Sequence, residues 1–402
     1  MGASQMFANI LRILGGIIIV KLLMPEQLGM FNGFALILGY LPILQVGVAN
    51  GLNRELPYYL GKGDKEVAYN FASVAQYWEI LLAIICCSIL FILGVFYVFR
   101  QDYVNGISCF AYTFAVGHLF YGTYYLQILY RTNQDFNKLS LITLIVSVVS
   151  FLSILFVWLW GYYGLCVRLT ILSSVEFFLL WKWKPIRVKA NFNKKIFVDI
   201  IKIGIPIYVV GIIFSLWATF QNTLVLKIGG VEQYGFFALA IMVQSSLEVL
   251  TSAVSQVLYP KMAYEYGKGK RLSEILVAAR KPIIVILCFL LPSLVLVWFI
   301  LPYIVNFLMP QYNPGIKAAQ WTLPLVLLSV LSIYNLIFNI VKRQQDYLWT
   351  LISGIGSFVI VLFICYWSKG YSLLIFPFAM ICGKAVQLVY AFFYIRSYQH
   401  KY

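Results

Sequence analysis

Long apolar runs, each of about 20 residues, alternate along this chain with short stretches of polar and turn-forming residues. A run of that length crosses the hydrocarbon core of a bilayer as an α-helix, which satisfies its own backbone hydrogen bonds there. Turn-forming residues mark the breaks, for example Met24-Pro25, Gly161 and Gly229-Gly230. The pattern predicts twelve spanning helices, at residues 6–23, 29–50, 76–99, 105–129, 138–158, 162–182, 204–228, 233–258, 282–308, 317–341, 346–366 and 371–395. The shortest joins, 158–162 and 366–371, predict tight helical hairpins.

The amino-acid composition supports a membrane location. Of the 402 residues, 62% are apolar and 11% are charged, whereas about 25% of the residues in a soluble domain are charged. The seven cysteines fall inside apolar runs and show no ligand spacing with the two histidines, which predicts small buried side chains rather than disulfides or metal ligands. We therefore expect an all-α polytopic membrane protein without a metal or other cofactor.

The chain contains an internal repeat. Glu26-Gln27 and Gly61-Lys62-Gly63 recur 206 residues later as Glu232-Gln233 and Gly267-Lys268-Gly269. Each copy has an apolar run, a Glu-Gln-x-Gly corner, a second apolar run and an amphipathic tail that ends in Gly-Lys-Gly. We interpret Gly-Lys-Gly as a helix C-cap followed by a turn rather than as a phosphate-binding loop, because the flanking residues of a P-loop are absent. The duplication predicts two similar halves.

Basic residues are distributed unevenly among the connections. The even-numbered connections and the C-terminal tail hold 22 Lys and Arg, and the odd-numbered connections hold 5. This bias predicts that both termini and the Gly-Lys-Gly turns lie in the cytoplasm. It also explains the net charge of +16 without a nucleic-acid partner.

Six helices in each half, with both termini on one side, require parallel repeats related by an axis along the membrane normal. The predicted fold is therefore two pseudo-symmetric six-helix bundles around a central cleft. The predicted domains are an N-terminal bundle at residues 1–182, a basic cytoplasmic linker at 183–203 and a C-terminal bundle at 204–402. A cleft that opens to either face is the architecture of a transporter.

Three cations, Arg12, Arg168 and Lys384, lie inside predicted spanning helices. A cation at the bilayer centre costs about 2.5–3.5 kcal/mol on insertion scales, so each requires a cavity, a partner or an anionic ligand. One interpretation is that they bind the negative charge of a substrate, such as a phosphate or pyrophosphate group. The alternative is internal pairing with Glu79, Glu176 or Glu248, or snorkelling toward the membrane surface.

Polar stripes within the helices are further candidates for substrate binding. Amides and hydroxyls suit the hydroxyl groups of a sugar, and tyrosines near them suit either sugar stacking or a membrane-interface belt. Glu248 is alternatively an ion-coupling carboxylate, and His118 is either a proton relay or a structurally satisfied histidine. The candidate polar residues are Gln45, Asn50, Gln244, Glu248 and Ser252.

Several short motifs in order resemble the polysaccharide transporter family. They are Pro25-Glu26-Gln27-Leu28-Gly29-x-Phe31, Gly51-Leu52-Asn53-Arg54-Glu55-Leu56-Pro57, Gly61-Lys62-Gly63-Asp64, Trp183-x-Pro185, Gly204-x-Pro206 and Glu232-Gln233-x-Gly235. These proteins are lipid-linked oligosaccharide flippases of the multidrug/oligosaccharidyl-lipid/polysaccharide (MOP) superfamily. The resemblance implies a MATE-like fold and no enzymatic activity. Many members carry an acidic-basic pair where this chain has Gln221-Asn222-Thr223, so the resemblance does not support ion coupling at that position.

The resemblance implies flipping of an undecaprenyl-pyrophosphate-linked sugar repeat unit across the bacterial inner membrane, for O-antigen (lipopolysaccharide), capsule or exopolysaccharide assembly. The expected partners are the lipid-linked oligosaccharide, membrane lipids and candidate glycan polymerase or assembly proteins. One alternative is a cation-coupled multidrug exporter of the same superfamily, which requires deep carboxylates. The other is a membrane-bound glycan polymerase or ligase, a class that typically carries a large external loop, whereas every predicted outward connection here is short.

Overall fold

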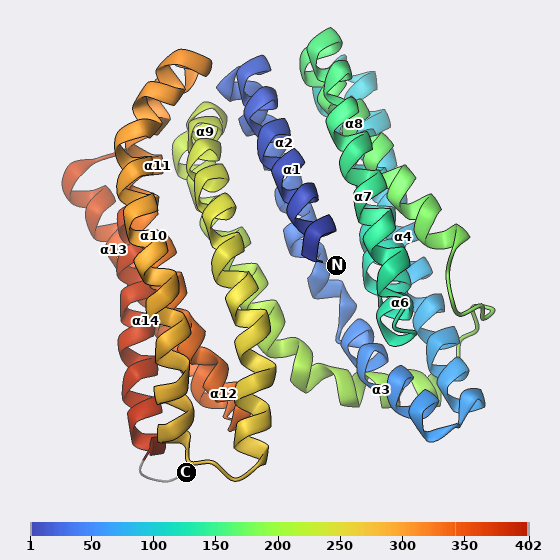
Figure 1. Cartoon of the computed structure of the whole chain (residues 1–402). Helices are drawn as coiled ribbons and strands as arrows, with labels where there is room; N and C mark the ends of the chain where they lie inside the picture. Colours follow the sequence, from blue (N-terminus) through green and yellow to red (C-terminus); the bar gives the residue numbers. More distant parts are fainter. Residues whose placement is uncertain (1, 342, 400–402) are drawn as a thin grey trace. The chain divides into compact units, whose positions relative to one another are not determined.

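The computed structural model describes residues 2–341 and 343–399 and is helical almost throughout (Figure 1). The elements are α1 (Gly2–Leu22), α2 (Pro25–Tyr40), η1 (Leu41–Gln45), α3 (Val48–Lys62), α4 (Lys65–Phe99), α5 (Tyr103–Gly117), the π-helix η2 (His118–Leu126), α6 (Gln127–Thr132), α7 (Phe136–Leu152), α8 (Ile154–Lys182), α9 (Lys194–Gly267), α10 (Leu272–Leu308), η3 (Pro310–Gly315), α11 (Ile316–Leu331), η4 (Ser332–Asn335), α12 (Leu336–Ile340), α13 (Gln344–Lys369) and α14 (Ile375–Gln399). Within the described residues, eight helical stretches are long and apolar enough to span a membrane.

The chain forms two compact units, unit 1 (Met1–Phe220) and unit 2 (Gln221–Tyr402). The core of unit 1 includes Leu52 and Leu129, and that of unit 2 includes Leu290 and Val326. Large apolar side chains elsewhere on the long helices α4 and α10 are exposed, as expected for surfaces that contact lipid rather than water. The predicted domain limits of 1–182, 183–203 and 204–402 remain a prediction.

The predicted breaks fall where the backbone leaves the helical region. Gly161 interrupts α8 with φ 52° and ψ −123°, and Gly230 interrupts α9 with φ 82° and ψ 175°. Gly370, with φ 71°, ends α13 five residues before α14 begins. Both predicted hairpin joins therefore contain a glycine in a conformation that other residues rarely adopt.

The two Gly-Lys-Gly sequences end helices in the same way. In the first copy, Gly63 N–H donates to the Leu60 carbonyl and Asp64 N–H donates to the Tyr59 carbonyl. In the second copy, Gly269 N–H donates to the Tyr266 carbonyl and Lys270 N–H donates to the Glu265 backbone carbonyl. The final glycines have φ 86° and φ 83°. This pattern of hydrogen bonds is a Schellman cap, which confirms the prediction of a helix C-cap.

The two copies differ in the middle of the repeat. The first copy breaks at Val46 and Gly47, with φ 43° and 86°, whereas the described backbone of the second copy is helical from residue 231 to 267. The predicted helix at 29–50 is therefore wrong at its end, because it is divided among α2, η1 and α3. The hydroxyl of Tyr208 donates to the carbonyls of Pro42 and Ile43, each at 3.0 Å. A side chain from a helix distant in sequence thus supplies a donor to the carbonyls left open by the break.

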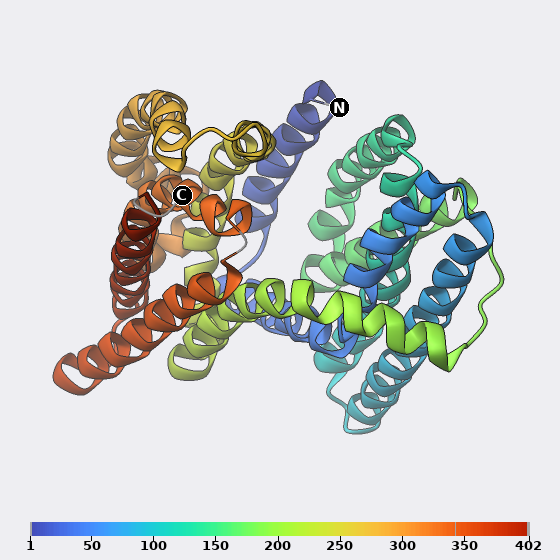
Figure 2. The same cartoon turned by 90° about the horizontal axis from the view of Figure 1, so that it is seen from below.

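The segment between α8 and α9 is irregular over residues 183–193 and lies along α4 (Figure 2). The backbone N–H of Asn191 donates to the Ser73 carbonyl at 3.4 Å, and the Ser73 hydroxyl donates to the Lys189 carbonyl. The predicted linker at 183–203 is thus irregular only in its first part, because α9 begins at Lys194.

A close backbone approach in unit 1 predicts a measurable change in stability. A Cβ atom at Gly204 would lie 1.9 Å from the Gly47 carbonyl oxygen, whereas a Cβ at Gly211 on the same helix meets nothing within 4 Å. We expect Gly204→Ala to lower the stability of the purified protein by about 1–3 kcal/mol, because the backbone has to separate. Gly211→Ala is the control and should leave stability unchanged or raise it by up to about 1 kcal/mol. Thermal unfolding in detergent measures both, and equal melting temperatures would contradict the close approach.

Candidate functional site

Three helices of unit 2 bring polar side chains together among apolar residues. The amide of Gln244 donates to Glu248 Oε1 at 3.0 Å, and the Ser329 hydroxyl donates to the same oxygen at 3.1 Å. Lys384 on α14 is near enough for its charge to be influenced by Glu248, but the two do not form a salt bridge in the described part of the chain. We call these four half-buried residues, from α9, α11 and α14, the unit 2 polar cluster.

Local packing explains how this cluster is positioned. Gln244 and Glu248 are one helical turn apart, so their side chains lie on the same face of α9. Gly383, next to Lys384, allows α14 to approach α13 closely, because a Cβ there would lie 2.8 Å from the Gly354 carbonyl oxygen. Helix α14 also packs against α11, which carries Ser329. Close packing against α13 and α11 therefore positions the helix that carries the lysine, and the hydrogen bond from Ser329 joins the carboxylate of α9 to α11.

The cluster contains three of the predicted site residues, Gln244, Glu248 and Lys384. Ser252, two turns after the start of the stripe, is exposed and does not contact Glu248 in the described structure. Ser329 was not predicted. It is one of many serines in apolar helices, and only the packing of α11 against α9 distinguishes it.

In unit 1, the predicted site residue Gln45 is buried in the protein. Its side-chain amide donates to Glu79 Oε2 at 2.5 Å, and the two residues are only 2% and 1% exposed. Gln45 Oε1 and Glu79 Oε1 have no hydrogen-bond partner in the described part of the chain. Sequence reasoning gave Glu79 as a partner for a cation, whereas the structure pairs it with an amide. Asn50, in the first turn of α3, is half-buried.

The tyrosines of the fourth predicted helix are core residues. Tyr121, Tyr125 and Tyr130 are buried, and the ring centroids of Tyr121 and Tyr125 are 5.3 Å apart in a stacked pair. The Tyr121 hydroxyl accepts a 2.8 Å bond from the Gln76 amide, and the Tyr130 hydroxyl donates to the Leu180 carbonyl. The interpretations as an interface belt or a sugar-stacking surface are therefore wrong for these three side chains, because neighbouring helices cover them.

His118 begins the π-helix η2 and faces a carboxylate. Its Nε2 lies 3.5 Å from Glu176 Oε2, and Glu176 Oε1 accepts a 3.3 Å bond from Gln127. His118 also lines a surface groove of about 620 Å³ in which Ser173 and Trp181 take part. His118 Nε2 has no hydrogen-bond partner in the described part of the chain, although the Glu176 carboxylate lies within ion-pair distance. The structural interpretation and the relay interpretation therefore both remain predictions.

The two remaining cations differ in their surroundings. Arg168 donates through Nε to the Ser150 carbonyl at 3.2 Å and through a terminal nitrogen to the Ser150 hydroxyl at 2.5 Å. It is thus satisfied within unit 1 by a helix neighbour rather than by a carboxylate. Arg12 is exposed on α1, and no polar contact to it is described. The described contacts of unit 1 do not join Arg12, Arg168 and Gln45 into one site.

Among the described residues, no group of three His, Cys, Asp or Glu is arranged to hold a metal ion.

A family model described as polysaccharide biosynthesis protein matches residues 18–314. The chain belongs to this family. The match covers most of the chain and includes both copies of the repeat, so it confirms the resemblance that the motifs indicated. Among curated proteins, none matches the chain in sequence.

Solved structures with the same fold include transporters of the MOP superfamily. An inward-facing MATE family multidrug resistance transporter of the MOP superfamily has a TM-score of 0.80 at 15% identity, covering 98% of this chain and 95% of the other. The lipid II flippase MurJ, in an inward closed conformation, has a TM-score of 0.74 at 15% identity, covering 98% and 87%. A MOP superfamily transporter from Pyrococcus furiosus has a TM-score of 0.65 at 16% identity, covering 99% and 92%. The fold is therefore that of MOP transporters, and this family member is a multi-pass membrane protein.

The buried pair in unit 1 predicts an asymmetric response to mutation. Gln45→Leu should destabilise the protein by about 1–3 kcal/mol, because it leaves the Glu79 carboxyl buried without its partner. Glu79→Gln should cost less than about 1 kcal/mol, because an amide in that place still accepts the bond from Gln45. Thermal unfolding of the purified variants measures the difference.

The double variant Gln45→Leu/Glu79→Leu provides the control. It removes both polar groups and should recover part of the stability lost in Gln45→Leu. The pairing would be contradicted if the stability lost by the double variant equalled the sum of the losses measured for Gln45→Leu and Glu79→Leu separately.

Proposed function

We propose that the protein is a flippase that moves an undecaprenyl-pyrophosphate-linked oligosaccharide repeat unit from the cytoplasmic to the outer leaflet of a bacterial inner membrane by alternating access, for O-antigen, capsule or exopolysaccharide assembly. The observation that carries the proposal is membership of the polysaccharide biosynthesis family by a chain with the fold of MOP transporters. The lipid II flippase MurJ, which shares this fold, supports a lipid-linked substrate by analogy.

The proposed architecture is twelve spanning helices in two pseudo-symmetric six-helix bundles around a central cleft, with both termini in the cytoplasm. Eight strongly apolar stretches and a glycine at each predicted hairpin support this arrangement. The basic connections support the orientation. In this proposal the sugar passes along polar side chains in the cleft, and the prenyl chain stays in lipid.

The unit 2 polar cluster supplies the proposed electrostatic step. Without substrate, Glu248 balances the charge of Lys384, which reduces the cost of holding a cation among apolar helices. A pyrophosphate carries more negative charge than a carboxylate and accepts several hydrogen bonds, so it competes with Glu248 for Lys384. Ser329 and Gln244 remain as donors to the released carboxylate. Arg12 is proposed as a second cation that attracts the same group.

A cation-coupled multidrug exporter is the second candidate, and Glu79 is the observation that favours it. This carboxyl group is deeply buried and lacks a cationic partner in the described structure, as a proton-binding residue would. For this function, Glu79→Gln should abolish drug efflux from loaded vesicles. The flippase proposal instead predicts no drug efflux by the wild-type protein, so Glu79→Gln would cause no change in this assay.

The flippase proposal predicts the effect of removing the cations. Arg12→Ala and Lys384→Ala should each lower export of surface glycan at least tenfold in a strain that depends on this protein, because each loses attraction for the pyrophosphate. Arg100→Ala is the matched control, since Arg100 is exposed at the end of α4 and stacks on Phe96 at 4.4 Å. Surface glycan is measured by labelling intact cells, and membrane levels of each variant by immunoblot.

Transfer of a purified lipid-linked oligosaccharide in proteoliposomes separates transport from assembly. The expected result is protein-dependent exposure of the sugar on the opposite face of the vesicle, reduced in the Lys384→Ala variant. Normal export by both cation variants would refute the electrostatic step, and absence of transfer by the wild-type protein would refute the flippase function.

A further inference from the structure

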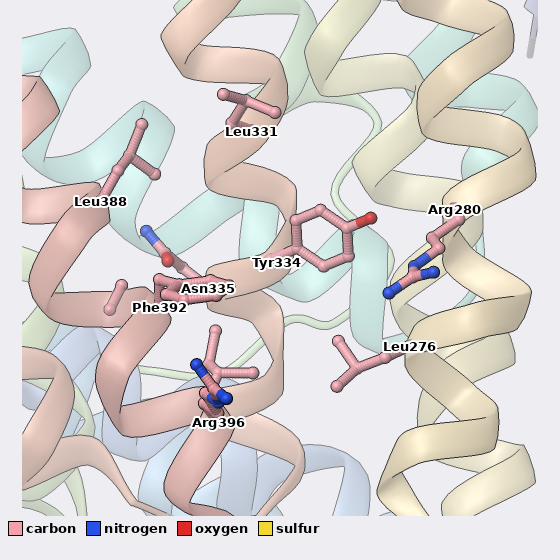
Figure 3. A pocket seen from close by; sticks show the side chains of 10 residues that line it. Leu276, Arg280, Leu331, Tyr334, Asn335, Leu388, Phe392 and Arg396 are labelled. Carbon is pink, nitrogen blue, oxygen red and sulfur yellow. The ribbon is translucent and has the colours of Figure 1, made fainter. Parts of the chain in front are cut away.

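A pocket of about 410 Å³ lies inside unit 2, between α10, the end of α11 with η4, and α14 (Figure 3). Its walls combine apolar side chains with two arginines, a tyrosine and an asparagine. The lining residues are Leu276, Arg280, Leu331, Tyr334, Asn335, Leu388, Ala391, Phe392, Ile395 and Arg396. The unit 2 polar cluster contributes none of them, so this pocket is distinct from the proposed transport site.

The positive charges of the pocket are not neutralised by protein. Arg280 on α10 and Arg396 on α14 enter it from different helices, with Tyr334 between them in the view of Figure 3. Neither arginine forms a salt bridge with a carboxylate in the described part of the chain. An anion in the pocket would therefore meet two guanidinium groups, which bind phosphate oxygens in a fork geometry.

Asn335 provides an independent indication of a ligand. It lines the pocket and is only 6% exposed, yet neither its amide nitrogen nor its oxygen has a hydrogen-bond partner among the described residues. Buried side-chain amides are normally satisfied, because an unpaired buried polar group costs stability. A bound molecule that both accepts and donates hydrogen bonds would satisfy both ends of this amide.

The remaining walls suit a hydrocarbon chain. Leu276 and Leu388 line the pocket, and Phe392 is 60% exposed beside it. Arg280 and Arg396 belong to the connections that the charge bias places on the cytoplasmic side. A basic pocket between spanning helices at that surface, with an apolar wall toward the membrane, matches the layout of a lipid at the interface.

We propose that this pocket binds an anionic glycerophospholipid of the cytoplasmic leaflet. Its phosphate lies between Arg280 and Arg396, its head-group hydroxyl and phosphate pair with the Asn335 amide, and one acyl chain lies along Leu276, Leu388 and Phe392. Tyr334 and Asn335 are the only uncharged polar groups of the described lining, too few for an oligosaccharide head group, which requires many hydrogen bonds. The proposal does not depend on the flippase function.

The test compares lipid binding and stability of the full-length protein in nanodiscs. Phosphatidylglycerol and phosphatidylcholine with identical acyl chains are the probes, with prenyl pyrophosphate as a third arm. The wild-type protein should retain phosphatidylglycerol at least tenfold more tightly than phosphatidylcholine in native mass spectrometry. Arg280→Ala/Arg396→Ala should remove this preference, and Arg280→Lys/Arg396→Lys should keep part of it because the charge remains. Arg271→Ala, an exposed arginine outside the pocket, should leave it unchanged.

Asn335→Leu gives a readout that a purely structural role would not produce. In phosphatidylcholine this variant should be as thermostable as the wild-type protein or more so, because an unpaired buried amide is removed. In phosphatidylglycerol it should lose most of the wild-type stabilisation by the anionic lipid. For each variant the readout is the difference between its own melting temperatures in the two lipids, so a change in basal stability does not affect the comparison.

Three results would overturn the proposal. The first is an equal affinity of the wild-type protein for the two phospholipids. The second is an unchanged preference in the double arginine-to-alanine variant, which would show that the lipid binds elsewhere on the surface. The third is tight binding of prenyl pyrophosphate without binding of phosphatidylglycerol, which would make the pocket part of the substrate path.

Discussion

Polar side chains inside an apolar helix bundle have to be satisfied by protein or by ligand, and this requirement governs the informative parts of the structure. Water is absent from the hydrocarbon region, so an unpaired charge or amide there is costly. Gln45 meets part of this requirement for Glu79, and Ser150 meets part of it for Arg168. Glu248 meets it with two neutral donors, Gln244 and Ser329.

The same requirement separates structural from functional groups. Arg168 donates two of its five N–H groups to Ser150 on a neighbouring helix, so packing within unit 1 explains part of its hydrogen bonding. Glu248 accepts hydrogen bonds from two neutral donors, so in the proposed function an anionic substrate can bind Lys384 without leaving Glu248 unpaired. Asn335 has no protein partner in the described residues. Polar groups that protein does not fully satisfy are therefore the better candidates for contact with ligands.

Much of the helical framework could be predicted from the sequence, because its signals are local. Gly161, Gly230 and Gly370 occupy conformations that favour glycine, and the Gly-Lys-Gly ends have the hydrogen bonds of a C-cap. These features depend on a few adjacent residues, which the sequence displays directly. The family motifs likewise occur in order along the chain.

The parts that could not be predicted depend on residues far apart in the sequence. The break at Gly47 is accommodated by Gly204, whose backbone lies against it, and no local signal gave this contact. Glu79 and Gln45 are 34 positions apart, so their spacing did not indicate a pair. The apolar and polar pattern of the fourth predicted helix likewise gave no sign that residues 118–126 form a π-helix or that its tyrosines are buried.

The two copies of the repeat carry different residues at a position that belongs to the unit 2 polar cluster. In the frame of 206 residues that relates the two copies, Glu248 of unit 2 corresponds to Pro42 of unit 1. In the first copy this position lies in η1, where the helix is broken, and in the second copy it is a glutamate on a continuous helix. Two copies of one helical frame thus carry a bend in one half and an anion in the other. The duplicated sequence therefore accounts for the helical frame that the two halves share, whereas the side chains at equivalent positions have diverged.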